Sequence, residues 1–150
     1  PDGMTAAWSC PFDPDVLLLV LDKEHTTSEN IRHTKKFVVA LPCEEQKKTA
    51  LDLGSVHGRD VGNKLQIKDV KTEKSQKFGL DVMSGALAYF ECELQDEKLF
   101  EEKGICLSKV VNVYVKDDCW DDKEECFNPG IKRTLHHVAG STFCSGGDLV

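Results

Sequence analysis

Residues 105–115 read ICLSKVVNVYV, with an apolar side chain at nearly every odd-numbered position. Successive side chains of a strand point to opposite faces of its sheet, so this spacing predicts a β-strand. The side chains expected to share its apolar face are Ile105, Leu107, Val111, Val113 and Val115. A period of two is typical of antiparallel sheets that pack one face against a core.

A second strand is predicted over residues 86–94, ALAYFECEL, where the alternation is equally regular. One face carries Ala88, Phe90, Cys92 and Leu94, and the other carries Glu91 and Glu93. This pattern indicates a half-buried strand.

Local signals predict the remaining elements. The Leu-rich apolar run at 16–21 is bounded by turn residues and indicates a buried strand. Residues 26–29, TTSE, fit the S/T-x-x-E capping box, so a short helix is expected from there through Lys35. Further elements are expected as a strand at 37–41 ended by Pro42, a helix at 44–53, a glycine-punctuated loop at 54–62, and a final strand at 135–143 interrupted by Gly140.

These four or five strands and two helices lack regular strand–helix–strand alternation. The expected fold is therefore mainly β, an antiparallel barrel with a few short helices rather than a doubly wound sheet. No linker divides the 150 residues, so residues 1–150 are expected to form one domain.

The net charge of -7 disfavours a general nucleic-acid binder. Its acidity lies in one block, residues 91–128, which overlaps an acidic excursion from Cys119 to Gly130. That excursion is interpreted as a solvated loop, although a single-sign patch also steers partners of opposite charge. No apolar run is long enough for a transmembrane helix, so no membrane association is expected.

The seven cysteines are an odd number, and no secretion signal precedes them. A disulfide framework is therefore not expected, and most thiols are interpreted as small core residues of a reduced, cytoplasmic protein. No CxxC spacing supports a zinc site, and His136 and His137 lie on opposite faces of their strand, so no metal is expected.

The first segment with chemical potential is 4–9, MTAAWS. Ala6 and Ala7 allow a flat ligand to approach the backbone, while Trp8 offers a large face and one N–H donor. The alternative is that Trp8 is a core residue of a short strand.

The second segment is 22–28, DKEHTTS, where a strand ends and a helix begins with three hydroxyl side chains. A helix N-terminus favours an anion, and Lys23 adds positive charge. The alternative is that Thr26 or Thr27 only caps the helix.

The third segment is 55–64, in which Gly58 permits unusual backbone angles and Arg59 and Lys64 supply positive charge. Neither a Walker loop nor GxGxxG occurs. The alternative is a solvated loop tip.

Taken in order, the three segments resemble the flavin reductase-like family of FMN-binding split barrels. The resemblance also includes residues 37–39 (FVV), the loop 54–61 (GSVHGRDV) with Lys64, and residues 135–140 (LHHVAG), and it covers nearly the whole chain. The family has a further strand before the Thr-Ala-Ala-Trp segment. We therefore expect either that the sequence given starts after that strand or that this barrel is completed differently.

The resemblance implies a Greek-key barrel, usually a homodimer with FMN near the subunit interface. It places Thr5, Ala6, Ala7, Trp8 and Ser9 along the isoalloxazine and ribityl chain. It places Lys23, Thr26 and Thr27 near the phosphate, together with the loop residues Ser55, His57, Gly58 and Arg59 and the lysine Lys64. His57 stands where many members have serine, and Leu65 where phenylalanine is usual.

The function expected from this resemblance is an FMN-dependent oxidoreductase that takes electrons from NADH or NADPH, with the final acceptor left open. The flavin carries the redox chemistry, so no side chain is assigned as a catalytic acid or base. Two alternatives remain: a flavoredoxin-like carrier that passes electrons between proteins, and a flavin-free barrel that serves as an interaction module.

Overall fold

The structure, a computed structural model, describes residues 15–67, 70–116 and 118–148 of the chain. In these ranges no helix has both the length and the apolar character needed to cross a membrane. The residues Thr5 to Ser9 of the first segment lie outside the described part.

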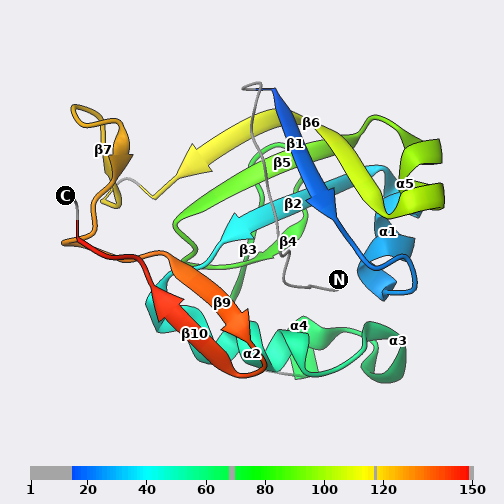
Figure 1. Cartoon of the computed structure of the whole chain (residues 1–150), viewed down its shortest axis with the longest axis horizontal. Helices are drawn as coiled ribbons and strands as arrows, with labels where there is room; N and C mark the ends of the chain where they lie inside the picture. The colour runs from blue at the N-terminus through cyan, green and yellow to red at the C-terminus, as the bar shows by residue number, and fades with distance from the viewer. Residues whose placement is uncertain (1–14, 68–69, 117, 149–150) are drawn as a thin grey trace.

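Four antiparallel strands form the central sheet, in the order β1-β6-β5-β2 (Figure 1). Their bounds are Val16–Val20 (β1), Ile105–Val115 (β6), Ala88–Leu94 (β5) and Lys36–Leu41 (β2). The predicted strands at 16–21, 37–41, 86–94 and 105–115 are thereby confirmed to within two residues. The antiparallel pairing follows from their alternating patterns.

The remaining described strands pair into three two-stranded ribbons. They are β3 (Thr72–Lys74) with β4 (Asp81–Met83), β7 (Trp120–Asp121) with β8 (Cys126–Phe127), and β9 (Leu135–Ala139) with β10 (Thr142–Ser145). The prediction of one final strand at 135–143 is therefore wrong. Gly140 has a φ of +53° and lies in the turn between β9 and β10, so the chain reverses there.

The helices lie at two places in Figure 1. Helix α1 (Thr26–Thr34) and helix α5 (Glu97–Lys103) lie at one end of the central sheet. The 3-10 turn η1 (Glu44–Gln46) and helices α2 (Lys47–Gly54), α3 (Gly58–Val61) and α4 (Lys64–Ile67) follow β2 and lie below the sheet in the view. The helix expected at 44–53 is confirmed as η1 followed by α2.

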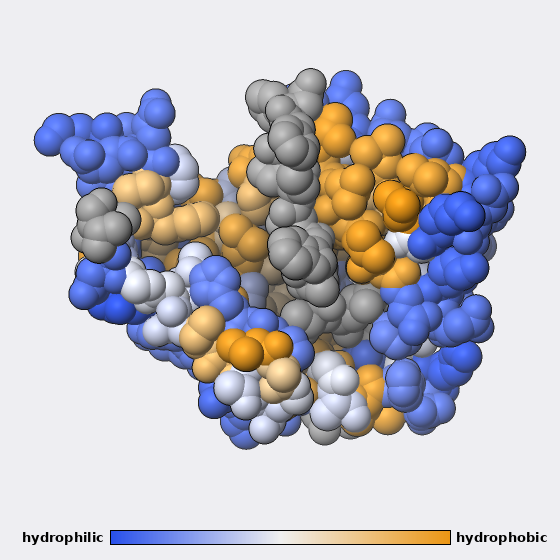
Figure 2. Space-filling model, in the orientation of Figure 1, coloured by the Kyte–Doolittle hydropathy of each residue, from blue (hydrophilic) through white to orange (hydrophobic). Residues whose placement is uncertain are grey.

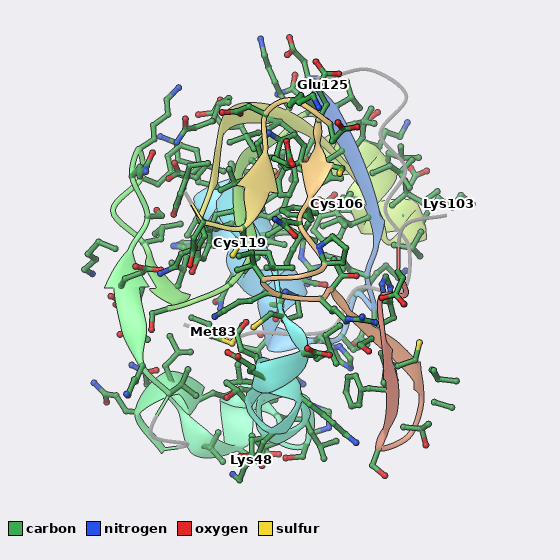
Figure 3. The ribbon with its side chains drawn as sticks, turned by 90° about the vertical axis from the view of Figure 1, so that its left-hand side faces the viewer. Lys48, Met83, Lys103, Cys106, Cys119 and Glu125 are labelled. Carbon is green, nitrogen blue, oxygen red and sulfur yellow. The ribbon has the colours of Figure 1, made fainter. Side chains whose placement is uncertain are left out.

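The main core joins the sheet to α1 and α5. Its buried side chains are Leu17, Leu19, Leu21, Ile31, Phe37, Cys92, Phe100 and Cys106. Cys43 and Cys119 are also buried, in a second cluster around Leu87, so four of the cysteines are small core residues as predicted. Cys106 and Cys119 both lie in the interior in Figure 3.

The predicted apolar face of β6 is not the buried one. Cys106 and Ser108 are fully buried, whereas Ile105 and Leu107 are only half-buried. The reason is that β1 is apolar on both faces, so Leu18 pairs with Leu107 on the outer side of the sheet. The Ser108 hydroxyl is satisfied in the core because it donates to the carbonyl of Leu17 at 2.8 Å. Figure 2 shows apolar residues gathered over β1 and β6.

Helix α5 lies outside the helices predicted from the sequence, although clear signals flank it. Asp96 caps its N-terminus by accepting a hydrogen bond from the Leu99 N–H at 2.8 Å. Gly104 ends it with a φ of +71°, and its N–H donates to the carbonyl of Phe100. A Cβ at position 104 would lie 2.5 Å from the carbonyl oxygen of Leu21, so only glycine allows α5 to approach β1 this closely.

Glu91 does not take the exposed position expected from the alternation of β5, because it is fully buried. Its carboxylate accepts hydrogen bonds from the backbone N–H groups of Lys77 and Phe78 at 2.7–3.0 Å and from Asn112 Nδ2 at 2.7 Å. Burial raises its pKa, but the hydrogen bonds from Asn112, Phe78, Ser75 and Lys77 outweigh burial and lower the pKa. An ionised carboxylate thus holds the turn between β3 and β4 against the sheet.

We expect Glu91→Gln to lower the free energy of unfolding at neutral pH by about 2 kcal/mol, because an amide is a weaker acceptor than a carboxylate. The folded-state pKa lies below the ordinary value of 4.5, so ionised Glu91 stabilises the fold above that value. This contribution is lost as the pH falls through the folded-state pKa. Urea unfolding across this pH range should show the difference between wild type and variant shrinking in acid.

Glu93→Gln is the matched control on the same strand. Glu93 is half-exposed, and its carboxylate lies 3.9 Å from the ammonium of Lys36. We expect a loss below about 1 kcal/mol, since exposed ion pairs contribute little. Equal losses in the two variants, or a Glu91→Gln effect that does not change with pH, would contradict the assigned burial of an ionised carboxylate.

Candidate functional site

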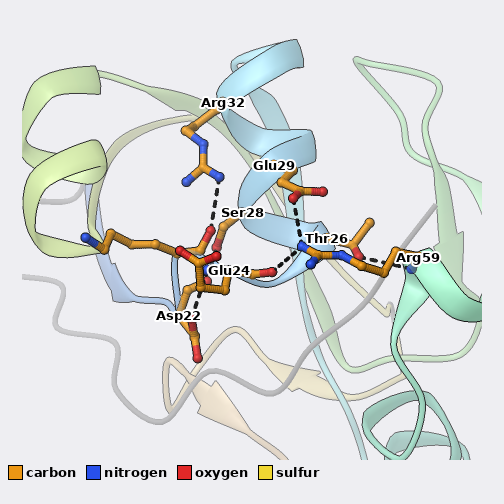
Figure 4. A network of polar contacts seen from close by, with 8 residues as sticks. Asp22, Glu24, Thr26, Ser28, Glu29, Arg32 and Arg59 are labelled. Carbon is orange, nitrogen blue, oxygen red and sulfur yellow. Dashed lines mark hydrogen bonds and ion pairs between the residues drawn. The ribbon is translucent and has the colours of Figure 1, made fainter.

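The turn that leads into α1 is fixed by side chains from two parts of the chain (Figure 4). Three successive carbonyl oxygens each accept a hydrogen bond: Asp22 O from Ser28 Oγ at 2.6 Å, Lys23 O from Arg32 Nη2 at 3.0 Å, and Glu24 O from Arg59 Nη2 at 2.5 Å. Ser28 is fully buried. These bonds hold the backbone immediately before His25 and Thr26 in one conformation.

The capping box predicted at 26–29 is wrong. Helix α1 begins at Thr26, and its N-cap residue His25 makes no side-chain cap bond. The Thr26 hydroxyl oxygen instead accepts a hydrogen bond from the backbone N–H of Arg59 at 3.2 Å. The Glu29 carboxylate pairs with the Arg59 guanidinium at 2.7 Å. The two side chains expected to cap α1 therefore join it to α3.

The glycine-punctuated loop contains one short helical turn, α3, which begins at Gly58. Gly58 permits unusual backbone angles but lies in this helical turn, and the positive φ of +71° occurs at Gly62 instead. Gly58 is buried where α3 approaches α1.

A pocket of about 440 Å³ lies beside this contact. It is bordered by the start of α1, the end of α2, residues 54–58, the first residue of α4 and the β9–β10 hairpin. Its lining residues are His25, Thr26, Ala50, Leu51, Gly54, Ser55, Val56, His57, Gly58, Lys64, His137, Gly140 and Phe143. The volume lies within the range of small-molecule sites.

The structure brings five of the residues singled out in the sequence to this pocket: Thr26, Ser55, His57, Gly58 and Lys64. Three others lie elsewhere. Lys23 is exposed, with its ammonium 3.5 Å from the carbonyl of Glu102, and Thr27 lines neither this pocket nor its neighbour. Arg59 lines the neighbouring pocket.

Lys64 supplies the positive charge of the pocket. Its side chain is only 4% exposed, and Nζ donates to the carbonyl of Leu53 at 3.2 Å. A charged group that is this far from water interacts more strongly with an opposite charge than a surface lysine does. Thr26 is the first residue of the nine-residue helix α1, so the N-terminus of this helix lies at the pocket, and its dipole also favours an anion.

A second hollow of about 320 Å³ shares His25 and His57 with the first. Its other lining residues are Asp22, Glu24, Arg59 and Asp60. Three acidic residues and one arginine line it, and the arginine guanidinium pairs with Glu29. The two hollows therefore differ in the charge of their lining residues, since among the described residues the second is lined by three acidic residues and the first by none.

The hairpin residues His137, Gly140 and Phe143 line the pocket but were not predicted as site residues. The single strand expected at 135–143 does not include the turn at Gly140 between β9 and β10. One feature of the sequence indicates the hairpin. Gly140 has a ring-bearing residue three positions before it (His137) and three positions after it (Phe143), and a turn at the glycine brings both rings to the same face of the hairpin. Ala50 and Leu51 were missed because nothing marks such residues as pocket-lining.

The model of the flavin reductase like domain matches residues 1–135. The uncharacterized protein YddH of Escherichia coli K12 is 30% identical over 151 aligned residues, which cover 98% of this chain and 79% of YddH. An uncharacterized protein of Pyrococcus abyssi is 25% identical over 98% of this chain and 83% of its own length.

Solved structures share the fold. An FMN-binding domain of a flavin reductases-like enzyme from Shewanella baltica superposes with a TM-score of 0.89 at 26% identity, covering 99% of this chain and 81% of that one. Flavoredoxin of Desulfovibrio vulgaris superposes with a TM-score of 0.82 at 16% identity, covering 100% of this chain and 81% of that one. The predicted fold class is thereby confirmed, and the chain belongs to the family of flavin reductase like domains, with their split-barrel fold.

Proposed function

We propose that the protein is an FMN-binding oxidoreductase that takes electrons from NADH or NADPH and passes them on through the flavin. The observation that carries this proposal is the pocket in which the buried cation of Lys64 lies beside the N-terminus of α1. Membership of the flavin reductase like family supports it, as does the FMN-binding description of the Shewanella baltica protein.

The residues of the pocket fit both ends of FMN. A phosphate dianion needs a cation and hydrogen-bond donors, which Lys64 and Thr26 provide. The Thr26 hydroxyl acts as acceptor in its contact with Arg59, so that contact does not use its hydrogen. The Ser55 hydroxyl instead donates to the carbonyl of Asp52 at 2.8 Å. We therefore assign the main polar contacts to Lys64 and Thr26.

Apolar and ring-bearing side chains suit the rest of such a ligand. Ala50, Leu51, Val56 and Phe143 give the pocket apolar walls, and such walls with a few polar groups are typical of cofactor sites. When bound, FMN supplies hydride acceptance and electron transfer. The chain supplies binding, orientation and electrostatic surroundings, and we assign no side chain as acid or base.

The first test is cofactor binding and turnover with the purified full-length chain. We expect FMN to bind, and NADH or NADPH to be consumed when FMN and an electron acceptor are present. FMN binding without nicotinamide oxidation would replace the proposed enzyme by an electron carrier. A protein that does not bind added FMN would contradict the proposal and leave the flavin-free interaction module.

The second test concerns the phosphate. Lys64→Gln should weaken FMN binding about 10- to 100-fold, the range that follows from the loss of one charge-assisted hydrogen bond. Equilibrium titration followed by flavin fluorescence measures the affinity, and circular dichroism verifies that the variant is folded. Lys98→Gln on α5 removes an exposed lysine that lines neither hollow and should bind FMN like wild type. Equal affinity of Lys64→Gln and Lys98→Gln would contradict the phosphate assignment.

We also propose a cytoplasmic location, which suits the six free thiols of the described residues.

We further propose a homodimer, in keeping with the family resemblance. The outer face of β1 and β6 supports the dimer, because Val20 is 49% exposed and Leu18 and Leu107 form an apolar pair beside it. Val20→Asp should shift the sedimentation mass from dimer to monomer, whereas Ile131→Asp, equally exposed on another part of the surface, should not. A monomeric wild-type protein would overturn this proposal.

A further inference from the structure

The β9–β10 hairpin brings two rings to the pocket. His137 and Phe143 are direct partners in its register, and their ring centroids lie 4.9 Å apart. Both residues line the pocket, together with Gly140 from the turn. Figure 1 shows β9 and β10 beside α2, whereas α1 and α3 lie on the right of the view.

The neighbouring side chains of β9 have other surroundings. His136 Nε2 contacts the hydroxyl of Thr134 at 2.7 Å, and Val138 is 61% exposed. Neither residue lines the pocket. Alternation along the strand thus places one histidine at the pocket and its immediate neighbour away from it.

The orientation of the His137–Phe143 pair is fixed by further contacts. His137 Nε2 lies 2.9 Å from the carbonyl oxygen of Gly140, and because a carbonyl only accepts, this nitrogen carries the hydrogen. Lys47 Nζ lies 6.0 Å from the centroid of the Phe143 ring, within reach of a cation–π contact. The rings are therefore held in place before any ligand arrives.

A second ring pair lines the same pocket. His25, before α1, and His57, before α3, have ring centroids 5.8 Å apart. Residues far apart in the sequence thus contribute four rings to one pocket whose only fully charged lining residue, among those described, is Lys64. Rings on more than one wall, with the charge confined to one place, are the arrangement that suits a flat ring joined to an anionic group.

Anchoring of the hairpin does not require the Phe143 ring. Its backbone is attached by the hydrogen bonds from Leu135 N to Pro42 O at 3.1 Å and from Glu44 N to Arg133 O at 2.9 Å. Most side chains of β9 and β10 are exposed, and Phe143 itself is only half-buried. A phenylalanine in this setting has its main apolar surface at the pocket rather than in the core.

We propose that the His137–Phe143 pair is the surface on which the flat ring of the bound flavin packs, and that Phe143 determines the affinity for that ring. The proposal rests on the proposed function and adds residues that the sequence did not identify. It assigns the two ends of the ligand to different residues: the phosphate to Lys64 and the ring system to the hairpin.

The test compares two flavins that differ only in the phosphate. FMN and riboflavin are titrated into the full-length wild-type chain and into Phe143→Leu, which keeps an apolar side chain but removes the ring. We expect Phe143→Leu to weaken both ligands by a similar factor, about three- to tenfold, as expected for the loss of one aromatic contact. It should also reduce the quenching of flavin fluorescence on binding. Lys64→Gln should weaken FMN far more than riboflavin.

His136→Leu and Val138→Ala are the matched controls, because they change the same strand on its other face. Both should bind FMN and riboflavin like wild type, whereas His137→Leu should resemble Phe143→Leu. Circular dichroism and thermal unfolding verify that all variants are folded.

The outcomes separate this inference from the proposed function. If wild type binds neither flavin, the proposed function itself fails. If wild type binds FMN but Phe143→Leu matches Val138→Ala with both flavins, the proposed function stands and the hairpin assignment is overturned. A Phe143→Leu variant with unchanged flavin affinity and quenching but a raised KM for NADH also overturns it, since the ring then contacts the nicotinamide donor instead.

Discussion

The pocket depends on the contact that Arg59 makes between two distant parts of the chain. Its guanidinium binds the carbonyl of Glu24 and the carboxylate of Glu29, and its backbone N–H binds the hydroxyl of Thr26. Helix α1 and residues 54–64 are distant in the sequence, and each contributes one side of the pocket. The ion pair itself is exposed and contributes little to global stability. The bond from the backbone N–H is independent of salt and sets the distance between the two sides.

The strand pattern predicted the antiparallel sheet well because alternation is a local property. It failed for the buried face of β6 and for Glu91, since both depend on what packs against the sheet. A strand that is apolar on both sides, as β1 is, does not specify which side faces the core. Glu91 becomes acceptable in the interior only because Asn112 and a turn from another ribbon supply its donors.

Part of the candidate site could also be predicted from the sequence, because it depends on local composition. Thr26, Ser55, His57, Gly58 and Lys64 stand in two short segments whose composition is unusual, and those segments meet. Lys23 and Arg59 carry the same kind of charge but turn elsewhere, because sequence spacing does not tell which way a long side chain points. The hairpin contribution was not predicted because the turn at Gly140 returns Phe143 to a pocket whose lining residues outside the hairpin lie between positions 25 and 64.

Charge distribution explains how an acidic protein can favour an anionic ligand. The chain carries a net charge of -7, yet most of its excess acid lies between residues 91 and 128. In Figure 3, Glu125 of that block and Lys48 of α2 lie at opposite ends of the molecule, and α2 contributes to the pocket. At physiological ionic strength, exposed charges are screened over about 8 Å, whereas a buried charge is screened much less. The ammonium of the buried Lys64 is therefore screened less from a ligand in the pocket than the distant exposed carboxylates are.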